Sequence, residues 1–143
     1  MSVNVGQRNV PDTPQNQQLN AGIKARELAL HTIKICSNKN VFIPEYQSAL
    51  TDDIIKTVKE IYIDVRAANS IRVICPEDWK ERSGLQRSAY RKCVDLLTLM
   101  NLAKPLFHIK GTKMSYWAKL TIETRENIKK WHESDNRRYG TIQ

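Results

Sequence analysis

The chain has 143 residues, of which 41% are apolar and 27% charged, and its formal net charge is +8. This length fits a single domain that can bury a core, and the composition is that of an ordinary globular protein. Five glycines and five prolines are too few for an all-β chain with many tight turns. No apolar run approaches the roughly 18 residues that span a bilayer, so the sequence excludes a membrane-spanning helix.

Three cysteines, Cys36, Cys75 and Cys93, form no CxxC pair, and their number is odd. Each lies in or beside an apolar helical segment, which favours buried, reduced thiols and a reducing compartment. The N-terminus lacks the basic and then apolar pattern of a signal peptide. We therefore expect a cytoplasmic protein.

Residues 1–18 are polar, with seven Asn or Gln and two prolines, and we expect a disordered tail. The first helix is predicted over residues 19–36. Its apolar side is assigned to Leu19, Ile23, Leu30 and Ile33, widened by Leu28 and Ile35. A polar segment, 37–40, ends this helix, and residues 41–43 form a short apolar lid for one end of a bundle.

The second helix is predicted from about Pro44 to Ile74, and it forms the spine of the fold. Its apolar seam steps by four and three residues and comprises Leu50, Ile54, Val58, Ile61, Val65, Ala68 and Arg72. A repeat of this period indicates a helix that packs along its length against other helices. Pro44 is tolerated in a first helical turn, and Pro76 ends the helical segment near Cys75.

The third helix is predicted to begin at Pro76 and to end or kink at Pro105. Gly84 lies inside this helix, where it costs about 1 kcal/mol relative to alanine, so we expect a close packing contact there. The fourth helix follows Thr112, a plausible N-cap, and ends near His132. The sequence thus predicts an all-α, antiparallel, up-down-up-down four-helix bundle over 19–132, followed by a flexible basic tail at 133–143.

Polar residues enter the helical seams near the turn between the second and third helices. This polar seam comprises Arg66, Asn69, Arg72 and Gln86, with Arg82 beside it. Charges at core-facing positions are costly unless they are paired or hydrated. Two interpretations remain open: a local hydrogen-bond cluster with Asp78 or Glu81, or a surface that faces another subunit or a nucleic acid.

Positive charge is concentrated in the second half of the chain. Over the 41 residues from 82 to 122 there is one acid, Asp95, and eight basic residues: Arg82, Arg87, Arg91, Lys92, Lys104, Lys110, Lys113 and Lys119. A solvated surface usually mixes charges of both signs, whereas such a concentration suits the phosphates of a nucleic acid. Tyr90, Phe107, His108 and Tyr116 lie in the same segment and could stack on bases. The alternatives are a solvated lysine face with core aromatics, and a surface that binds an acidic protein.

No catalytic or metal-binding pattern stands out. The three histidines, His31, His108 and His132, lie on different segments without metal-ligand spacing. Cys93 and His108 could in principle act as nucleophile and base, but Cys93 falls on a helical seam and is better interpreted as a core thiol. We expect a non-enzymatic protein with no cofactor and no metal.

Several short words of the sequence resemble the Avd-like proteins, the accessory variability determinants of diversity-generating retroelements in bacteria and phages. These words are Val-Arg-Ala-Ala-Asn (65–69), Arg-Ser-Gly-Leu-Gln-Arg-Ser-Ala (82–89), Leu-Leu-Thr-Leu (96–99), Phe-His-Ile (107–109), Tyr-Trp (116–117) and Ile-Lys-Lys-Trp-His-Glu-Ser-Asp (128–135). The likeness covers about residues 25–138. It consists of a similar helical pattern and short matching segments, without a catalytic signature.

The resemblance implies a homopentameric barrel of four-helix bundles that binds the element's reverse transcriptase and its template RNA or cDNA. Such a protein supports mutagenic reverse transcription without catalysing it. A related group of four-helix bundles is encoded in intervening sequences of ribosomal RNA genes, and it remains the alternative. An interaction protein of that type has no reverse transcriptase partner.

Overall fold

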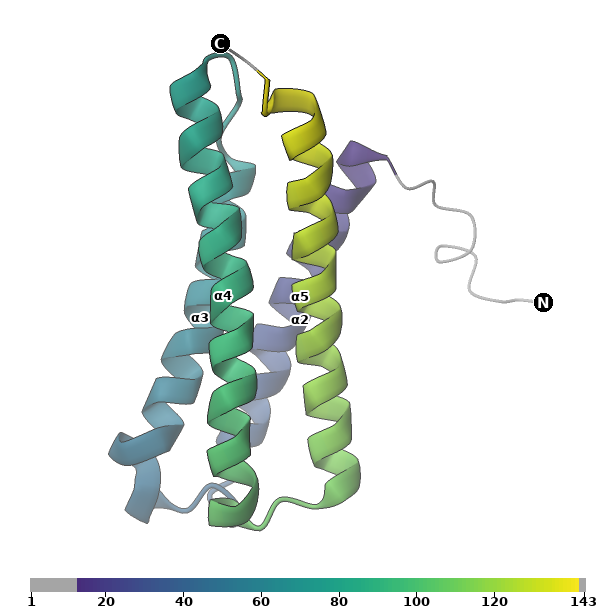
Figure 1. The fold of residues 1–143 in the computed structure, drawn as a ribbon. Coiled ribbons are helices and arrows are strands. Elements are labelled where there is room, and N and C mark those ends of the chain that lie inside the picture. The colour runs from purple at the N-terminus through teal and green to yellow at the C-terminus, as the bar shows by residue number, and fades with distance from the viewer. Residues whose placement is uncertain (1–12, 142–143) are drawn as a thin grey trace, which may run out of the picture.

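The computed structural model describes residues 13–141 and contains four long helices and no strand within that range. They are α2 (Pro14–Cys36), α3 (Asp52–Asn69), α4 (Pro76–Phe107) and α5 (Gly111–Tyr139) (Figure 1). Two short helical turns, η1 (Pro44–Tyr46) and η2 (Gln47–Thr51), precede α3. The predicted all-α class with four long helices is confirmed.

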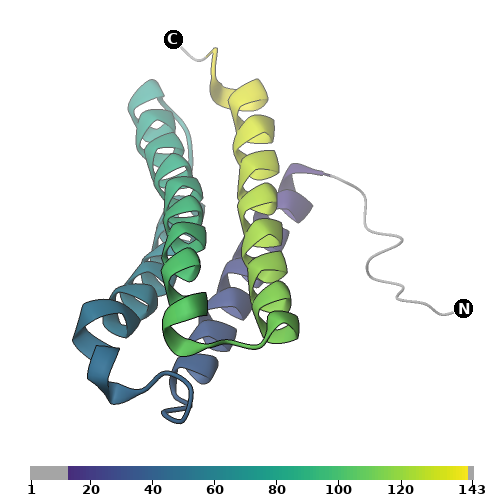
Figure 2. The ribbon, with the colours of Figure 1, turned by 60° about the horizontal axis from the view of Figure 1, so that its bottom comes forward.

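Each long helix packs against two others around one core. The packed pairs are α2 with α3, α3 with α4, α4 with α5, and α5 with α2. In Figures 1 and 2, the link between α3 and α4 lies at one end of the molecule and the link between α4 and α5 at the other. Helices α4 and α5 therefore pack side by side, with one face of each turned toward the other.

The seam predicted for the second helix is confirmed over most of its length. Ile54, Val58, Ile61, Val65 and Ala68 of α3 are all buried. The helix ends at Asn69 rather than Ile74, because Ser70 turns back on it: its N–H donates to the carbonyls of Arg66 and Ala67, and its Oγ donates to Ala67. Arg72 is therefore wrong as a seam residue, since it is exposed in the link before α4.

The apolar side predicted for the first helix is wrong for Leu19, Ile23, Leu30 and Ile33, whereas Leu28 is buried and Ile35 packs against the core, as predicted. The buried side of α2 instead carries mainly small residues, Ala21, Ala25, Leu28, Ala29, Thr32 and Cys36. Leu19 is 59% exposed, Ile23 52% and Leu30 51%. Alanines allow neighbouring helices to approach closely. Thr32 lies in the core, where its Oγ1 accepts a hydrogen bond of 2.9 Å from Nε1 of the buried Trp117.

The helical region extends beyond both predicted boundaries. Helix α2 begins at Pro14, with Thr13 as N-cap: its Oγ1 accepts a hydrogen bond of 3.2 Å from the Asn16 N–H, and proline is favoured in a first turn. The expected disordered tail is therefore wrong for 14–18, and its residues 1–12 lie outside the described range. Helix α5 continues to Tyr139 because Asp135 is buried against α4, so a flexible tail from 133 is also wrong.

The connection that follows α2 closes one end of the bundle, as predicted. Phe42 is buried and its ring centroid lies 4.6 Å from that of Phe107 and 6.1 Å from that of Trp117. Pro105 does not end α4, which continues to Phe107; the helix then stops at His108, whose φ of 53° is left-handed. Helix α5 begins one residue before the expected Thr112 cap.

Candidate nucleic-acid interface

The eight predicted basic contacts do not form one surface. Arg82 is the clearest exception, since it is only 5% exposed. Its Nε donates to Oδ2 of Asp135 at 2.7 Å, and its other two nitrogens donate to the Ile71 carbonyl at 3.0 Å and to Gln18 Oε1 at 3.1 Å. Its guanidinium also lies 5.2 Å from the Trp131 ring centroid. The assignment of Arg82 to nucleic-acid binding is therefore wrong.

Lys92 is also neutralised within the chain. Its Nζ lies 2.9 Å from Asp64 Oδ2 and 3.7 Å from Glu60 Oε1, both on α3. Ser88 donates a further hydrogen bond of 2.8 Å to the same Asp64 oxygen. This cluster ties α3 to α4, so we expect Lys92 to contribute to packing rather than to phosphate binding. Lys119 makes only a long, exposed contact of 4.0 Å with Glu123.

The remaining cations fall into two groups. Arg87 and Arg91 are exposed on the first half of α4, whereas Lys104, Lys110 and Lys113 are exposed around the turn between α4 and α5. From Arg87 to Lys104 the helix rises by about 26 Å at 1.5 Å per residue. Lys113 also borders a smaller cavity of about 410 Å³ between α2 and α5. The predicted patch is therefore two separate cationic surfaces.

The polar seam is organised by a residue that the sequence analysis missed. Gln86 is fully buried, and its Nε2 donates 2.8 Å to Oδ2 of Asp135, the same oxygen that binds Arg82. Asp135 on α5 is thus the anchor, rather than Asp78 or Glu81. Arg66 is exposed, and Asn69 is half-buried with no partner for its Oδ1 within 13–141. The four seam residues do not form one cluster.

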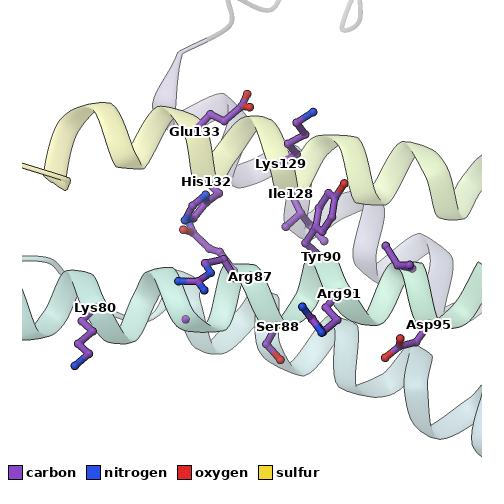
Figure 3. A pocket seen from close by; sticks show the side chains of 13 residues that line it. Lys80, Arg87, Ser88, Tyr90, Arg91, Asp95, Ile128, Lys129, His132 and Glu133 are labelled. Atoms are coloured by element: carbon purple, nitrogen blue, oxygen red, sulfur yellow. The ribbon is translucent and has the colours of Figure 1, made fainter.

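A groove of about 1130 Å³ runs between α4 and α5 (Figure 3). We call it the α4–α5 groove. From α4 it is lined by Lys80, Gly84, Gln86, Arg87, Tyr90 and Arg91, and from α5 by Ile128, Lys129, His132 and Glu133. In Figure 3, His132 extends from α5 toward Arg87 on α4, and Tyr90 lies beside Ile128 between the two helices. The groove thus combines basic, aromatic and apolar side chains.

The charge of this groove is positive and largely uncompensated. Lys80, Arg87, Arg91 and Lys129 are exposed, and none of them forms an ion pair with any residue from 13 to 141. Two carboxylates, Asp95 and Glu133, also lie on its walls. Four free cations against two acids give a surface that attracts an anion.

His132 is held in a fixed position on the α5 wall. Its Nε2 lies 2.9 Å from Ser83 Oγ, and its ring stacks on Trp79 with centroids 5.7 Å apart and an interplanar angle of 20°. Burial, and then the positive charge of Arg87, lower the pKa of His132 below its ordinary value. At neutral pH its ring is therefore uncharged, flat and already oriented for stacking.

Gly84 and Gln86 also line the groove. A Cβ placed on Gly84 would meet no atom within 4 Å, so the expected close packing at this glycine is wrong, and the position leaves open space. Next to it, the buried Gln86 has no hydrogen-bond partner for its Oε1 within the described part of the chain. Buried acceptors of this kind are uncommon and call for a physical explanation.

Two of the three thiols, Cys36 and Cys93, are poorly suited to act as nucleophiles, whereas Cys75 is only half-buried, so the prediction that all three are buried is wrong for Cys75. Cys93 is buried, as the seam position predicted, and burial raises its pKa to about 12; the same holds for Cys36. A thiol with such a pKa is protonated at neutral pH, whereas the thiolate is the reactive form.

Among residues 13–141 no group of three or more His, Cys, Asp or Glu side chains could hold a metal ion. None of the helices described is long and apolar enough to cross a membrane.

Lys80, Lys129 and His132 belong to the groove but were not among the predicted contacts. A signal for the first was present: Lys80, Gly84, Arg87 and Arg91 step by four, three and four residues and so share a helical face. The α5 residues could have been found by extending the seam of Thr124, Ile128 and Trp131 by four residues to Asp135. Lys129 and His132 follow directly after two of these core positions.

Comparisons with protein-family models, with curated proteins and with solved structures gave no match. The case for function therefore depends on the chemistry of the α4–α5 groove and on the resemblance of the short sequence words.

Proposed function

We propose that this protein is a non-catalytic nucleic-acid-binding accessory protein of a diversity-generating retroelement. In this role it binds the reverse transcriptase and the template RNA or cDNA in the cytoplasm and supports mutagenic copying. The observation that carries the proposal is the row of unpaired cations along the α4–α5 groove, Lys80, Arg87, Arg91 and Lys129. Cations that lack an internal partner can release condensed counterions from phosphates, which is the main source of nucleic-acid affinity.

A second part of the proposal concerns assembly. We propose that the helices run antiparallel, since the links 70–75 and 108–110 are short, and that five copies form a barrel. Support for self-association comes from α2, where Leu19, Ile23, Leu30 and Ile33 are exposed at steps of four, seven and three residues. This is the spacing of a helix that packs on another helix. Arg26, three residues after Ile23 and four before Leu30, occupies the remaining position of the repeat. Exposed apolar stripes of this kind mark interaction surfaces.

Reversing the charge of Arg87 and Arg91 is expected to abolish RNA binding. The double variant Arg87→Glu/Arg91→Glu replaces two cations with two anions on one face of α4, so at least a hundredfold loss of affinity for a single-stranded RNA is expected at about 100 mM salt. Fluorescence anisotropy measures the loss. Lys92 is left unchanged, because Asp64 and Glu60 already bind it.

The matched control is Lys56→Glu/Lys59→Glu, which makes the same charge change at exposed positions of α3. It lowers the net charge equally but leaves the groove intact, so only a severalfold effect is expected. Equal losses in both double variants would show that binding depends on total charge alone. Unchanged binding after substitution of Arg87 and Arg91 would refute the proposed surface.

Placing lysine on the α2 stripe is expected to dissociate the assembly. In Ile23→Lys/Leu30→Lys, two charges would have to be buried in the interface, while both side chains are exposed in the single chain. Light scattering after size exclusion should give about five times the 16.5 kDa chain mass for the parent and a single chain for the variant. Leu102→Lys, at a position on α4 that is 57% exposed, is the control and should remain assembled. A monomeric parent protein would overturn the assembly proposal.

A further inference from the structure

We infer that the α4–α5 groove is a binding site for one unstacked nucleotide of a single-stranded RNA or DNA. This inference rests on the proposed function but goes further, because it assigns a place to a base as well as to phosphates. The groove volume of about 1130 Å³ is slightly larger than the usual range for small-ligand sites, about 300–1,000 Å³. There is therefore room for a base, its sugar and the adjacent phosphate.

The phosphate would be bound by the rim of the groove. Arg87 and Arg91 lie one helical turn apart, which brings their Cβ atoms to about 5–6 Å from each other. Both are exposed and unpaired, so they can converge on one phosphodiester, and Arg presents a planar fork of donors that suits phosphate oxygens. Lys129 belongs to the opposite wall, on α5, although its side chain extends away from α4 in Figure 3.

The base would occupy the space between Tyr90 and His132. Tyr90 is half-buried and lies beside Ile128, which is apolar and fully buried. His132 is fixed by Trp79 and Ser83, and its lowered pKa leaves the ring neutral. Stacking on rigid aromatic rings is the usual way in which proteins bind unpaired bases without sequence preference.

Gln86 provides an independent reason to place a ligand here. Its Nε2 is committed to Asp135, and this bond fixes the orientation of the amide, while the Oε1 is buried without a partner. An N–H group on the edge of a base is the kind of donor that this acceptor lacks. Gly84 adds to the fit, since the absence of a side chain there leaves open space.

These features favour a single strand over a duplex. In a duplex the bases are stacked and paired, so they cannot enter a groove between two helices, and only the phosphates could contact its rim. A single strand can turn a base outward at little cost. The groove should therefore distinguish single-stranded from double-stranded RNA even though the charges attract both.

The test fills the groove without changing its charge. Gly84→Leu places a side chain where a Cβ meets nothing within 4 Å, and leucine favours the helix over glycine, so folding should be preserved and is checked by thermal melting. The probe is a fluorescein-labelled single-stranded RNA of 12 nucleotides, compared with the same RNA in a duplex. We expect about a tenfold loss of affinity for the single strand, the magnitude of one lost stacking contact, and less than a twofold change for the duplex.

The control is Asn101→Leu on α4, an exposed position that lines neither the groove nor the α2 stripe proposed for self-association. It should bind both RNAs like the parent. The dependence of the affinity on salt provides a second readout, because Gly84→Leu retains every cation and should keep the parental slope, whereas Arg87→Gln/Arg91→Gln should reduce the slope by about 1.4 for a single strand.

Each outcome separates the inference from the proposed function. If Gly84→Leu binds the single strand like the parent while Arg87→Gln/Arg91→Gln weakens it, the base does not enter the groove and only the inference fails. Equal losses for single strand and duplex would also overturn it, because the groove would then contact the backbone alone. If the parent binds neither RNA, the proposed function fails together with the inference.

Discussion

Replacing Asp135 with alanine is expected to cost about 3–5 kcal/mol of folding free energy, because it leaves a buried arginine without its counterion. Asp135 is 1% exposed, and one of its oxygens binds both Arg82, at 2.7 Å, and Gln86, at 2.8 Å. Removing the carboxylate leaves two buried donors unsatisfied and an uncompensated charge next to Trp131. Urea unfolding followed by circular dichroism measures the loss.

Two further variants serve as controls for this prediction. Asp95→Ala removes an exposed carboxylate from the wall of the groove, where it has no ion pair within residues 13–141, and should change stability by less than about 0.5 kcal/mol. The double variant Arg82→Met/Asp135→Leu should recover part of the loss, since apolar side chains can replace a buried ion pair. Recovery should remain incomplete because Gln86 still lacks an acceptor. A loss of under 1 kcal/mol for Asp135→Ala would contradict the assigned role.

The spine of the fold could be predicted from the sequence because large apolar residues recur along α3 with a helical period. The same reasoning failed for α2. There the large residues Leu19, Ile23 and Leu30 are exposed, and Ala21 and Ala25 are buried. A pattern of large apolar residues indicates that a face avoids water, but it does not indicate whether the face meets its own bundle or another chain. The small residues of the true inner face give little signal, since alanine is common on any helical surface.

The site was harder to predict than the fold, for a physical reason. Counting charges located the basic half of the chain, but the state of each cation depends on partners that are distant in sequence. Arg82 is neutralised by a residue 53 positions away, and Lys92 by one 28 positions away. Arg87 and Arg91 form no ion pair within residues 13–141, although α5 presents Glu133 as well as Lys129 and His132 to the groove. The packing of α4 on α3 and on α5 determines this difference.

Val65→Asp is expected to abolish cooperative folding. Val65 is 1% exposed in the C-terminal half of the α3 seam, where its buried neighbours along the seam, Ile61 and Ala68, are apolar. Aspartate there must either lose its hydration or take up a proton, and both outcomes cost several kcal/mol. Domains of this kind are stable by only about 5–15 kcal/mol, so one such group removes a large part of the total. The measurement is the far-UV circular dichroism signal and its urea dependence.

The matched control lies two residues away on the same helix. Ile63 is 60% exposed, so Ile63→Asp introduces the same charge with the same helix propensity into water and should leave the unfolding midpoint nearly unchanged. Val65→Ala tests size separately and should cost about 1–3 kcal/mol through the cavity it creates. If Val65→Asp and Ile63→Asp had similar effects, the two faces of α3 would not differ in burial. The seam that packs α3 against α4, and so helps to position the α4–α5 groove, would then have been assigned to the wrong side of α3.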